Sequence, residues 1–196
     1  MIVFPNAKIN IGLFVQRKRP DGFHDLATVF HPVPLYDALE VRPAPAWKFT
    51  HTGLPIPGKS QDNLVYKAWE LLHHDYGLPP VEVHLHKTIP LGAGLGGGSS
   101  DGAFMLKALN MEFDLGLSEM ELLPYARKLG SDCAFFIHNK TALGTGKGDE
   151  LSSFILVLRN YFLVLVYPGI HVPTAEAYSH VLPRARDLDW QKALLA

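Results

Sequence analysis

The chain of 196 residues lacks several features that would assign it to a class at once. Its only cysteine is Cys133, which excludes a disulfide framework and is compatible with a reducing compartment. Lysine and arginine number 18 against 19 aspartate and glutamate, so there is no cationic surplus for nucleic acid. No apolar run approaches the ~20 residues of a membrane span, and the N-terminus lacks a secretory signal. These absences favour a cytoplasmic protein without nucleic-acid or membrane partners.

What the chain does have is a glycine run at residues 90–101, in which five of twelve residues are glycine. The alternating residues 81–87 before it are typical of a strand, and the apolar spacing after it predicts a helix. Backbone N–H groups of glycines and of a helix start can approach an anion closely. The sequence therefore predicts a phosphate-binding loop, whereas a mobile surface loop would not need to lead directly into a helix.

Three known glycine loops fit this run poorly. A P-loop needs a lysine after its last glycine, but Gly98 is followed by Ser99 and Ser100. The dinucleotide fingerprint matches in spacing, yet the acidic residue expected at the end of a second strand about 20 residues on is missing. A protein-kinase loop joins two strands and is accompanied by motifs that are absent here.

Hydrophobic periodicity predicts both strands and helices, with 47% hydrophobic residues available for a core. Strands are expected at residues 2–17, 26–33, 38–42, 81–87 and 161–167. Helices are expected at residues 63–76 capped by Asp62, after the glycine run, after the capping box of Ser118 and Glu121, at residues 173–180, and from 189–190 onward. Residues 141–148 are expected to form a hairpin.

Single residues leave alternatives open at this point. Lys8 fits a solvated strand face, and His24 fits an ordinary loop histidine. Asp132 stands before an apolar run and is equally well explained as a helix cap or as a functional carboxylate. Cys133 is better explained as buried filler than as a nucleophile. His84 and His86 share a strand face, where a solvated surface is favoured over a metal pair because no third ligand is evident.

The pattern Pro-x-Gly-x-Gly-x-Gly-Gly-Gly-Ser-Ser, residues 90–100, resembles the central motif of the GHMP small-molecule kinases. Further segments at residues 5–10, 19–24, 62–64, 129–133 and 168–174 are similar in order and spacing to the branch of 4-diphosphocytidyl-2-C-methyl-D-erythritol kinases. The resemblance covers essentially the whole chain. It implies an α+β fold of the ribosomal protein S5 domain 2-like type, with mixed sheets and helices packed on them. It also implies ATP-dependent phosphorylation of a hydroxyl of a cytidine-diphosphate substrate in the non-mevalonate isoprenoid pathway.

The resemblance also implies site residues. Asp132 matches the catalytic base, and Lys8 the lysine that would keep it ionised and stabilise charge on the substrate oxygen. The substrate positions are Asn10, Phe23, His24, Thr174 and Tyr178, with cytosine between aromatic rings; Phe23 stands where the family usually has tyrosine. The ATP positions are Asn63, Leu64, Lys87, Pro90, Gly92, Gly94, Leu95, Gly96, Gly97, Gly98, Ser99 and Ser100. Ser99 or Ser100 would hold Mg²⁺, and Asp101 either helps hold the metal or starts the helix.

The chain departs from the family in its length. Residues 1–165 match the N-terminal ATP-binding and catalytic domain, and residues 166–196 match only the start of a C-terminal domain that is expected to be truncated. We therefore expect an apolar face to be exposed where that domain would pack, and with it self-association or instability. Two alternatives remain open: a nucleotide-binding remnant with little turnover, and a GHMP kinase for another small alcohol. The aromatic pair around a base argues against the second of these.

Overall fold

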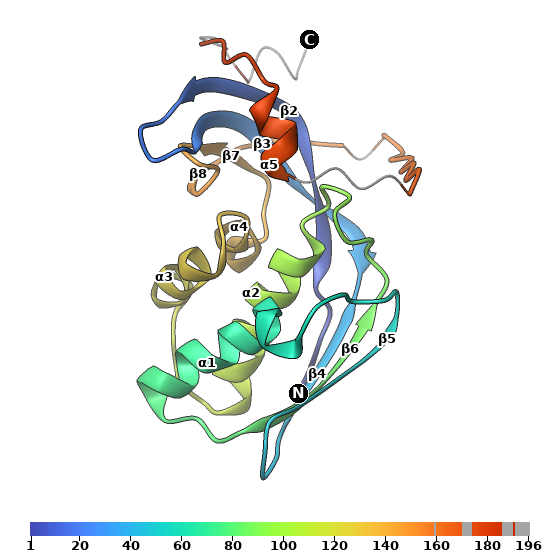
Figure 1. Cartoon of the computed structure of the whole chain (residues 1–196), viewed down its shortest axis with the longest axis vertical. Coiled ribbons are helices and arrows are strands. Elements are labelled where there is room, and N and C mark those ends of the chain that lie inside the picture. Colours follow the sequence, from blue (N-terminus) through green and yellow to red (C-terminus); the bar gives the residue numbers. More distant parts are fainter. Residues whose placement is uncertain (159, 170–173, 186–189, 191–196) are drawn as a thin grey trace. The chain divides into compact units, whose positions relative to one another are not determined.

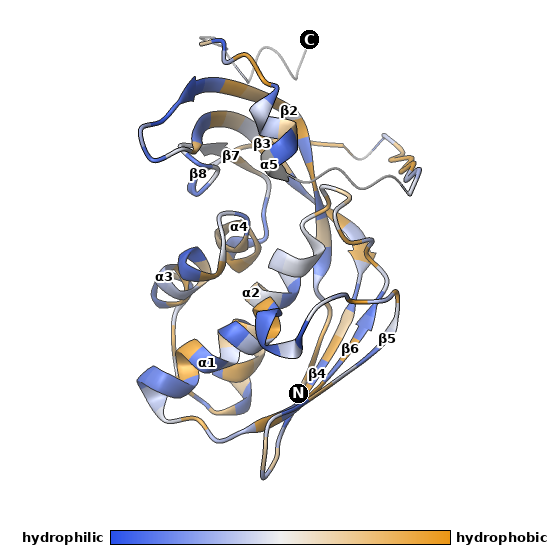
Figure 2. Cartoon of the chain, in the orientation of Figure 1, coloured by the Kyte–Doolittle hydropathy of each residue, from blue (hydrophilic) through white to orange (hydrophobic). Residues whose placement is uncertain are grey.

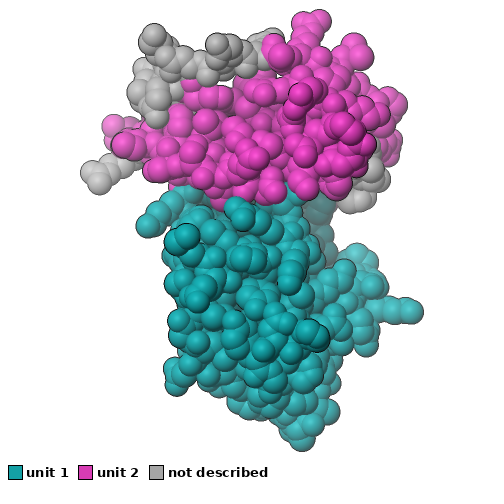
Figure 3. All heavy atoms as spheres, turned by 90° about the vertical axis from the view of Figure 1, so that its left-hand side faces the viewer, with its two compact units in different colours: residues 1–9, 32–140 teal, residues 10–31, 141–196 magenta. Residues whose placement is uncertain are grey.

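The computed structural model describes residues 1–158, 160–169, 174–185 and 190, apart from the side chains of residues 174 and 175. The chain forms two compact units (Figure 3). Unit 1 comprises residues 1–9 and 32–140, and unit 2 comprises residues 10–31 and 141–196. The domain boundary predicted after residue 165 stays a prediction.

Unit 1 contains a four-stranded sheet in the order β1-β4-β6-β5. Its strands are β1 (Ile2–Val3), β4 (Ala38–Pro43), β5 (Lys48–Gly53) and β6 (Val81–Lys87). β6 pairs antiparallel with β4, with Val41 opposite Val83, and parallel with β5. Hydrophobic and hydrophilic residues follow one another along β4 and β6 (Figure 2), and the odd-numbered residues of β6 are buried. One face of this sheet therefore belongs to the core.

The helices of unit 1 lie on one side of this sheet (Figure 1). They are α1 (Leu64–Tyr76), α2 (Gly97–Glu112), α3 (Glu119–Leu129) and α4 (Cys133–His138). The apolar run after Asp132 is thus a helix, and Cys133 through Ile137 are all buried. The capping box predicted for Ser118 and Glu121 is confirmed at the start of α3.

The cap predicted for α1 is wrong by one residue. Asn63, and not Asp62, accepts a hydrogen bond from the Val65 N–H at 2.9 Å. Asp62 instead ends the short 3-10 helix η1 (Ser60–Asp62). Both residue types are good caps, so the sequence alone did not separate them. The helix ends after Tyr76, as predicted, and Gly77 follows it in the left-handed region that glycine adopts readily.

Unit 2 is built on a second sheet, in the order β2-β3-β7-β8. The strands are β2 (Asn6–Lys18), β3 (His24–Tyr36), β7 (Ala142–Thr145) and β8 (Glu150–Ser153). The residues of β2 up to Ile9 and those of β3 from Pro32 belong to unit 1. β7 and β8 pair antiparallel, which confirms the predicted hairpin. α5 (Thr174–Ser179) forms within the helix predicted at 173–180, whose first residue lies outside the described ones.

The strand predicted at residues 161–167 does not form. Its residues make no strand pairing in the part of the chain that the structure describes, and Phe162 is 98% exposed. A strand needs a neighbour for its N–H and C=O groups, so apolar composition alone does not produce one. The helix start predicted at 189–190 falls largely outside the described residues. No helix within the described ranges is long and apolar enough to cross a membrane.

Candidate active site

The glycine loop, residues 90–96, lies within the connection from β6 to α2 in unit 1. Gly92, Gly94 and Gly96 have φ of 69°, 74° and 68°, a region that other residue types rarely adopt. Left-handed residues at alternate positions turn successive N–H groups toward one side and form an anion-binding concavity. Leu95 anchors the loop from beneath, because it packs with Ala7 and Ile89 in the core. The loop is thus a fixed backbone cradle leading into a 16-residue helix.

Lys8 is tied to this loop and to Asp132. Its N–H donates to the Leu95 carbonyl at 2.9 Å, and its Nζ lies 3.1 Å from Asp132 Oδ2. The Lys8 side chain is 6% exposed and that of Asp132 is 34% exposed. The solvated lysine that the strand pattern also allowed is therefore not what the structure shows. An ammonium and a reachable carboxylate stand together beside the cradle.

Glycine at position 96 is required for this approach. A Cβ there would lie 2.9 Å from Phe136 Cζ and 3.0 Å from Lys8 Cγ, closer than carbon atoms normally pack. Position 96 therefore combines a positive φ with close contact to Lys8.

Asp132 occupies the N-cap position of α4 but makes no side-chain cap hydrogen bond there. Its carboxylate pairs with Lys8 instead. The neighbouring Cys133 is buried, and burial is the main cause that raises the pKa of its thiol to about 12. A thiol of this kind stays protonated at neutral pH and is not a nucleophile, in keeping with the role of core filler.

Lys87 lies where β6 ends and is completely enclosed. Its Nζ is 2.5 Å from Asp37 Oδ2 and 2.7 Å from Asp101 Oδ2. All three side chains are at most 4% exposed. Lys87 is predicted to lie at the nucleotide, but the structure shows its ammonium paired with two carboxylates. Asp37 was not singled out in the sequence; the partners of its carboxylate are 50 to 52 residues away along the chain, so no local pattern reveals it.

Ser99 and Ser100, predicted to hold Mg²⁺, lie in the first turn of α2. Ser100 Oγ is buried and has no hydrogen-bond partner among the described residues. Within the described ranges no group of three or more His, Cys, Asp or Glu side chains could hold a metal ion. Magnesium in kinases binds one or two protein oxygens together with phosphates and water, so a serine hydroxyl here fits the donor type. Asp101 is 2% exposed and faces Lys87.

Asn63 and Leu64, also predicted on the nucleotide side, have structural contacts in unit 1. The Asn63 side chain caps α1. Leu64 Cβ is 2.9 Å from the point where Gly102 would carry a Cβ, so Leu64 packs closely on α2. These residues fix α1 against the helix that follows the glycine loop.

The predicted substrate residues lie in unit 2. Asn10 Nδ2 donates to Thr28 Oγ1 at 3.0 Å. His24 and Tyr178 stack with ring centroids 5.4 Å apart and planes at 20°. Phe23 is 56% exposed, and Lys147 Nζ lies 5.1 Å from the centre of its ring. Thr174 begins α5, but its side chain is outside the described part of the chain.

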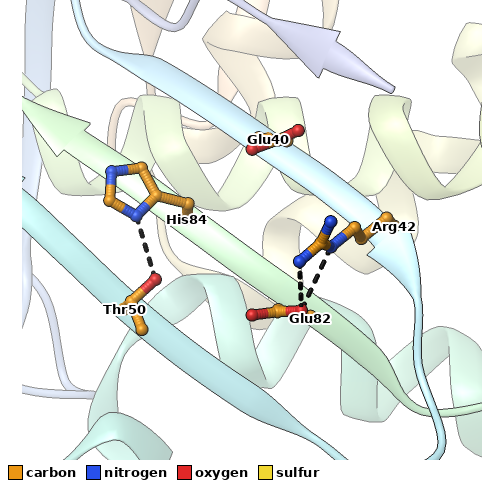
Figure 4. Close-up of a pocket in the computed structure, with 5 residues that line it drawn as sticks. All are labelled: Glu40, Arg42, Thr50, Glu82 and His84. Carbon is orange, nitrogen blue, oxygen red and sulfur yellow. Dashed lines mark hydrogen bonds and ion pairs between the residues drawn. The ribbon is translucent and has the colours of Figure 1, made fainter.

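A pocket of about 180 Å³ opens on the β4-β6-β5 face of unit 1, and the residues that line it are not among the predicted site residues (Figure 4). His84 Nδ1 is 2.9 Å from Thr50 Oγ1, and Arg42 pairs with Glu82 at 2.7 Å. Thr52 contacts both His84 and His86. The two histidines are thus held by threonines on a polar sheet surface.

Comparison with known proteins identifies the family. The family model described as GHMP kinases N terminal domain matches residues 63–140. The 4-diphosphocytidyl-2-C-methyl-D-erythritol kinase of Bacteroides thetaiotaomicron is 48% identical over 99% of this chain and 72% of its own length. The chain belongs to the 4-diphosphocytidyl-2-C-methyl-D-erythritol kinase family. The protein of that name from Cytophaga hutchinsonii is 53% identical over 93% of this chain and 68% of its own length.

Solved structures agree with this assignment. A crystal structure of 4-(cytidine 5'-diphospho)-2C-methyl-D-erythritol kinase matches 100% of this chain and 70% of its own, with a TM-score of 0.80 and 35% identity. The phosphomevalonate kinase of Streptococcus pneumoniae, at 16% identity and a TM-score of 0.56, shares the fold alone. The predicted α+β GHMP fold is confirmed. The 4-diphosphocytidyl-2-C-methyl-D-erythritol kinases are GHMP kinases, which are ATP-dependent small-molecule kinases.

Proposed function

We propose that this chain transfers the γ-phosphoryl group of ATP to a hydroxyl of 4-diphosphocytidyl-2-C-methyl-D-erythritol. The observation that carries the proposal is the 3.1 Å pair of Lys8 and Asp132, which adjoins the glycine loop through the Lys8 N–H. Phosphoryl transfer depends on positioning and on neutralising charge, and these groups can do both.

In this reaction Asp132 accepts the proton of the substrate hydroxyl. The hydroxyl oxygen forms a bond to the γ-phosphorus while the bond from that phosphorus to the bridging oxygen breaks, and ADP leaves with the electron pair. The Lys8 ammonium stabilises the negative charge that develops on the attacking oxygen. The hydrogen bond from the Lys8 backbone N–H to the Leu95 carbonyl holds this residue beside the glycine loop.

The amides of the glycine loop and the start of α2 hold the phosphates of ATP. Mg²⁺, when bound through the hydroxyl of Ser99 or Ser100, would neutralise phosphate charge. The buried Ser100 Oγ supports this, since it finds no partner among the residues that the structure describes and so has unused bonding capacity.

The cytosine is recognised by the aromatic side chains of unit 2. The ring centroids of His24 and Tyr178 are 5.4 Å apart. A base can lie between the two rings only if this distance increases to about 7 Å, which is twice the contact distance of stacked rings. Lys147 beside Phe23 supplies positive charge for a diphosphate. A base linked to a diphosphate explains this combination better than a small uncharged alcohol would.

ADP release with the cytidine-diphosphate substrate tests the proposal. We expect turnover in the chain as it stands, and a fall in kcat of about 10²- to 10⁴-fold in Asp132→Asn with little change in ATP affinity. Asp114→Asn is the matched control, since Asp114 is exposed and its φ of 48° suits asparagine. Unaltered turnover in Asp132→Asn would remove this residue from the role of base. Binding of an ATP analogue without any ADP release would favour a nucleotide-binding remnant.

A cytoplasmic location, a domain boundary after residue 165 and self-association are further parts of this proposal. Val164 and Val166 are each 81% exposed in a segment with little polar character, which supports self-association. Light scattering at increasing protein concentration tests it, because a constant monomer mass would contradict self-association.

A further inference from the structure

We propose that Asp101 and Asp37 are positioning residues for the phosphate loop, acting through the buried ammonium of Lys87. The inference deepens the proposed function and rests on its assignment of the glycine loop to ATP. Neither carboxylate faces the loop's solvent side: Asp37 is 1% and Asp101 2% exposed.

The ion pair of Lys87 and Asp101 closes the loop at its base. Lys87 is the last residue of β6, Asp101 lies in the first two turns of α2, and residues 88–96 between them form the connection. Their 2.7 Å contact therefore joins the point where the chain leaves the sheet to the helix that receives it. The contact also lies directly beneath the helix start, since a Cβ on Gly97 would be 3.0 Å from Lys87 Nζ.

Asp37 fixes the first residues of the same connection. Its Oδ1 accepts hydrogen bonds from the N–H groups of Thr88 and Ile89, at 2.5 and 2.9 Å. Its own N–H donates to the Pro5 carbonyl at 2.8 Å. The first two residues after β6 are thus linked through Asp37 to Pro5, the residue that precedes β2 and leads to Lys8.

The charges show that Asp101 is not required to balance Lys87. Asp37 alone neutralises the ammonium, and Asp101 adds a second buried carboxylate whose Oδ1 has no hydrogen-bond partner in the described part of the chain. A surplus buried charge is unfavourable for folding, and burial raises the pKa of Asp101 to about 7. A residue that stabilises little but links both ends of a binding loop is better explained by positioning that loop.

Asp101→Leu separates positioning from stability. The Lys87–Asp37 pair remains balanced, so we expect the variant to fold with a urea midpoint at or above that of the wild type. Hydrogen exchange of the ligand-free protein should be at least tenfold faster at the hydrogen-bonded amides of the loop base, those of Lys8, Ile89 and Ser100, and unchanged in α3. Affinity for a non-hydrolysable ATP analogue should fall about tenfold, equally with and without Mg²⁺.

Asp101→Asn keeps an oxygen that can accept from Lys87, so its loop exchange and affinity should stay close to those of the wild type. Asp75→Leu, at the far end of α1, is the control for replacing a carboxylate in unit 1. Unchanged loop exchange in Asp101→Leu, or a large loss of stability, would overturn the inference. An affinity loss only with Mg²⁺ would also overturn it, since Asp101 would then act on the metal. A wild type that binds no ATP analogue refutes the proposed function, while the exchange data still decide the positioning role.

Discussion

Gly97 and Gly98 provide a test of how tightly the base of the phosphate loop is packed. Both belong to the first turn of α2, and they differ in their surroundings. A Cβ on Gly97 would lie 2.9 Å from Ile89 Cγ2 and 3.0 Å from Lys87 Nζ, whereas a Cβ on Gly98 would meet nothing within 4 Å. The two alanine variants therefore share the same chemistry and differ only in crowding.

The expected magnitudes follow from this difference. Alanine in place of a helical glycine stabilises by about 0.5–1 kcal/mol, because less backbone entropy is lost on folding. Gly98→Ala should gain this amount. Gly97→Ala should gain the same amount but lose about 1–3 kcal/mol to overpacking. The neighbours cannot yield easily, because Ile89 is fully buried and Lys87 is held by two carboxylates.

Urea unfolding followed by circular dichroism measures both variants against the wild type. We expect Gly98→Ala to be more stable than Gly97→Ala by about 1–3 kcal/mol at equal m-values. Equal stabilities would show that Lys87 and Ile89 are free to shift. The description of the loop base as rigid would then be wrong, and the positioning role of Asp101 would lose its physical basis.

The remaining predictions concern a cap and a titration. Ser118→Ala removes the capping box of α3 and should lower the free energy of unfolding by about 1 kcal/mol, measured against Ser153→Ala on the exposed edge of β8. Burial raises the pKa of Asp101 from 3.8 to about 7, so the folded state binds more protons than the unfolded state between these values. Its contribution to stability is therefore present at low pH and lost as pH rises from about 4 to about 7. In Asp101→Asn the fall in unfolding free energy between pH 5 and 8 should be smaller than in the wild type, and an unchanged slope would contradict the titration.

Local patterns predicted the elements that surround the site. The alternation in β6, the glycine loop and the helical spacing of α2 lie next to one another in sequence, so each could be read without knowledge of the fold. The end of α1 at Gly77 and the start of α3 at the Ser118 capping box also depend on local sequence. The strand expected at residues 161–167 failed because strand formation depends on a partner, and its own sequence carries no information about one.

Contacts between distant residues were beyond such patterns. The resemblance to GHMP kinases pointed to Lys8 and Asp132, but their separation of 3.1 Å follows from the approach of β2 to α4 in unit 1. The pairing of Lys87 with Asp37 depends on β4 lying beside β6, with Leu39 opposite Leu85. A lysine that ends a strand normally reaches water, so no rule based on sequence predicts its complete burial.

The structure devotes several independent restraints to one short connection. Three glycines with positive φ set its backbone conformation, and the Leu95 side chain anchors it in the core. The Lys8 N–H donates to the Leu95 carbonyl. The buried charges beneath it fix where it begins and ends. A glycine-rich segment loses much conformational entropy when it is ordered, so such a loop would fluctuate without these contacts. Because these contacts order the amides before ATP binds, the loss of conformational entropy occurs during folding and does not weaken ATP binding. The same contacts keep Lys8 and Asp132 beside the phosphates.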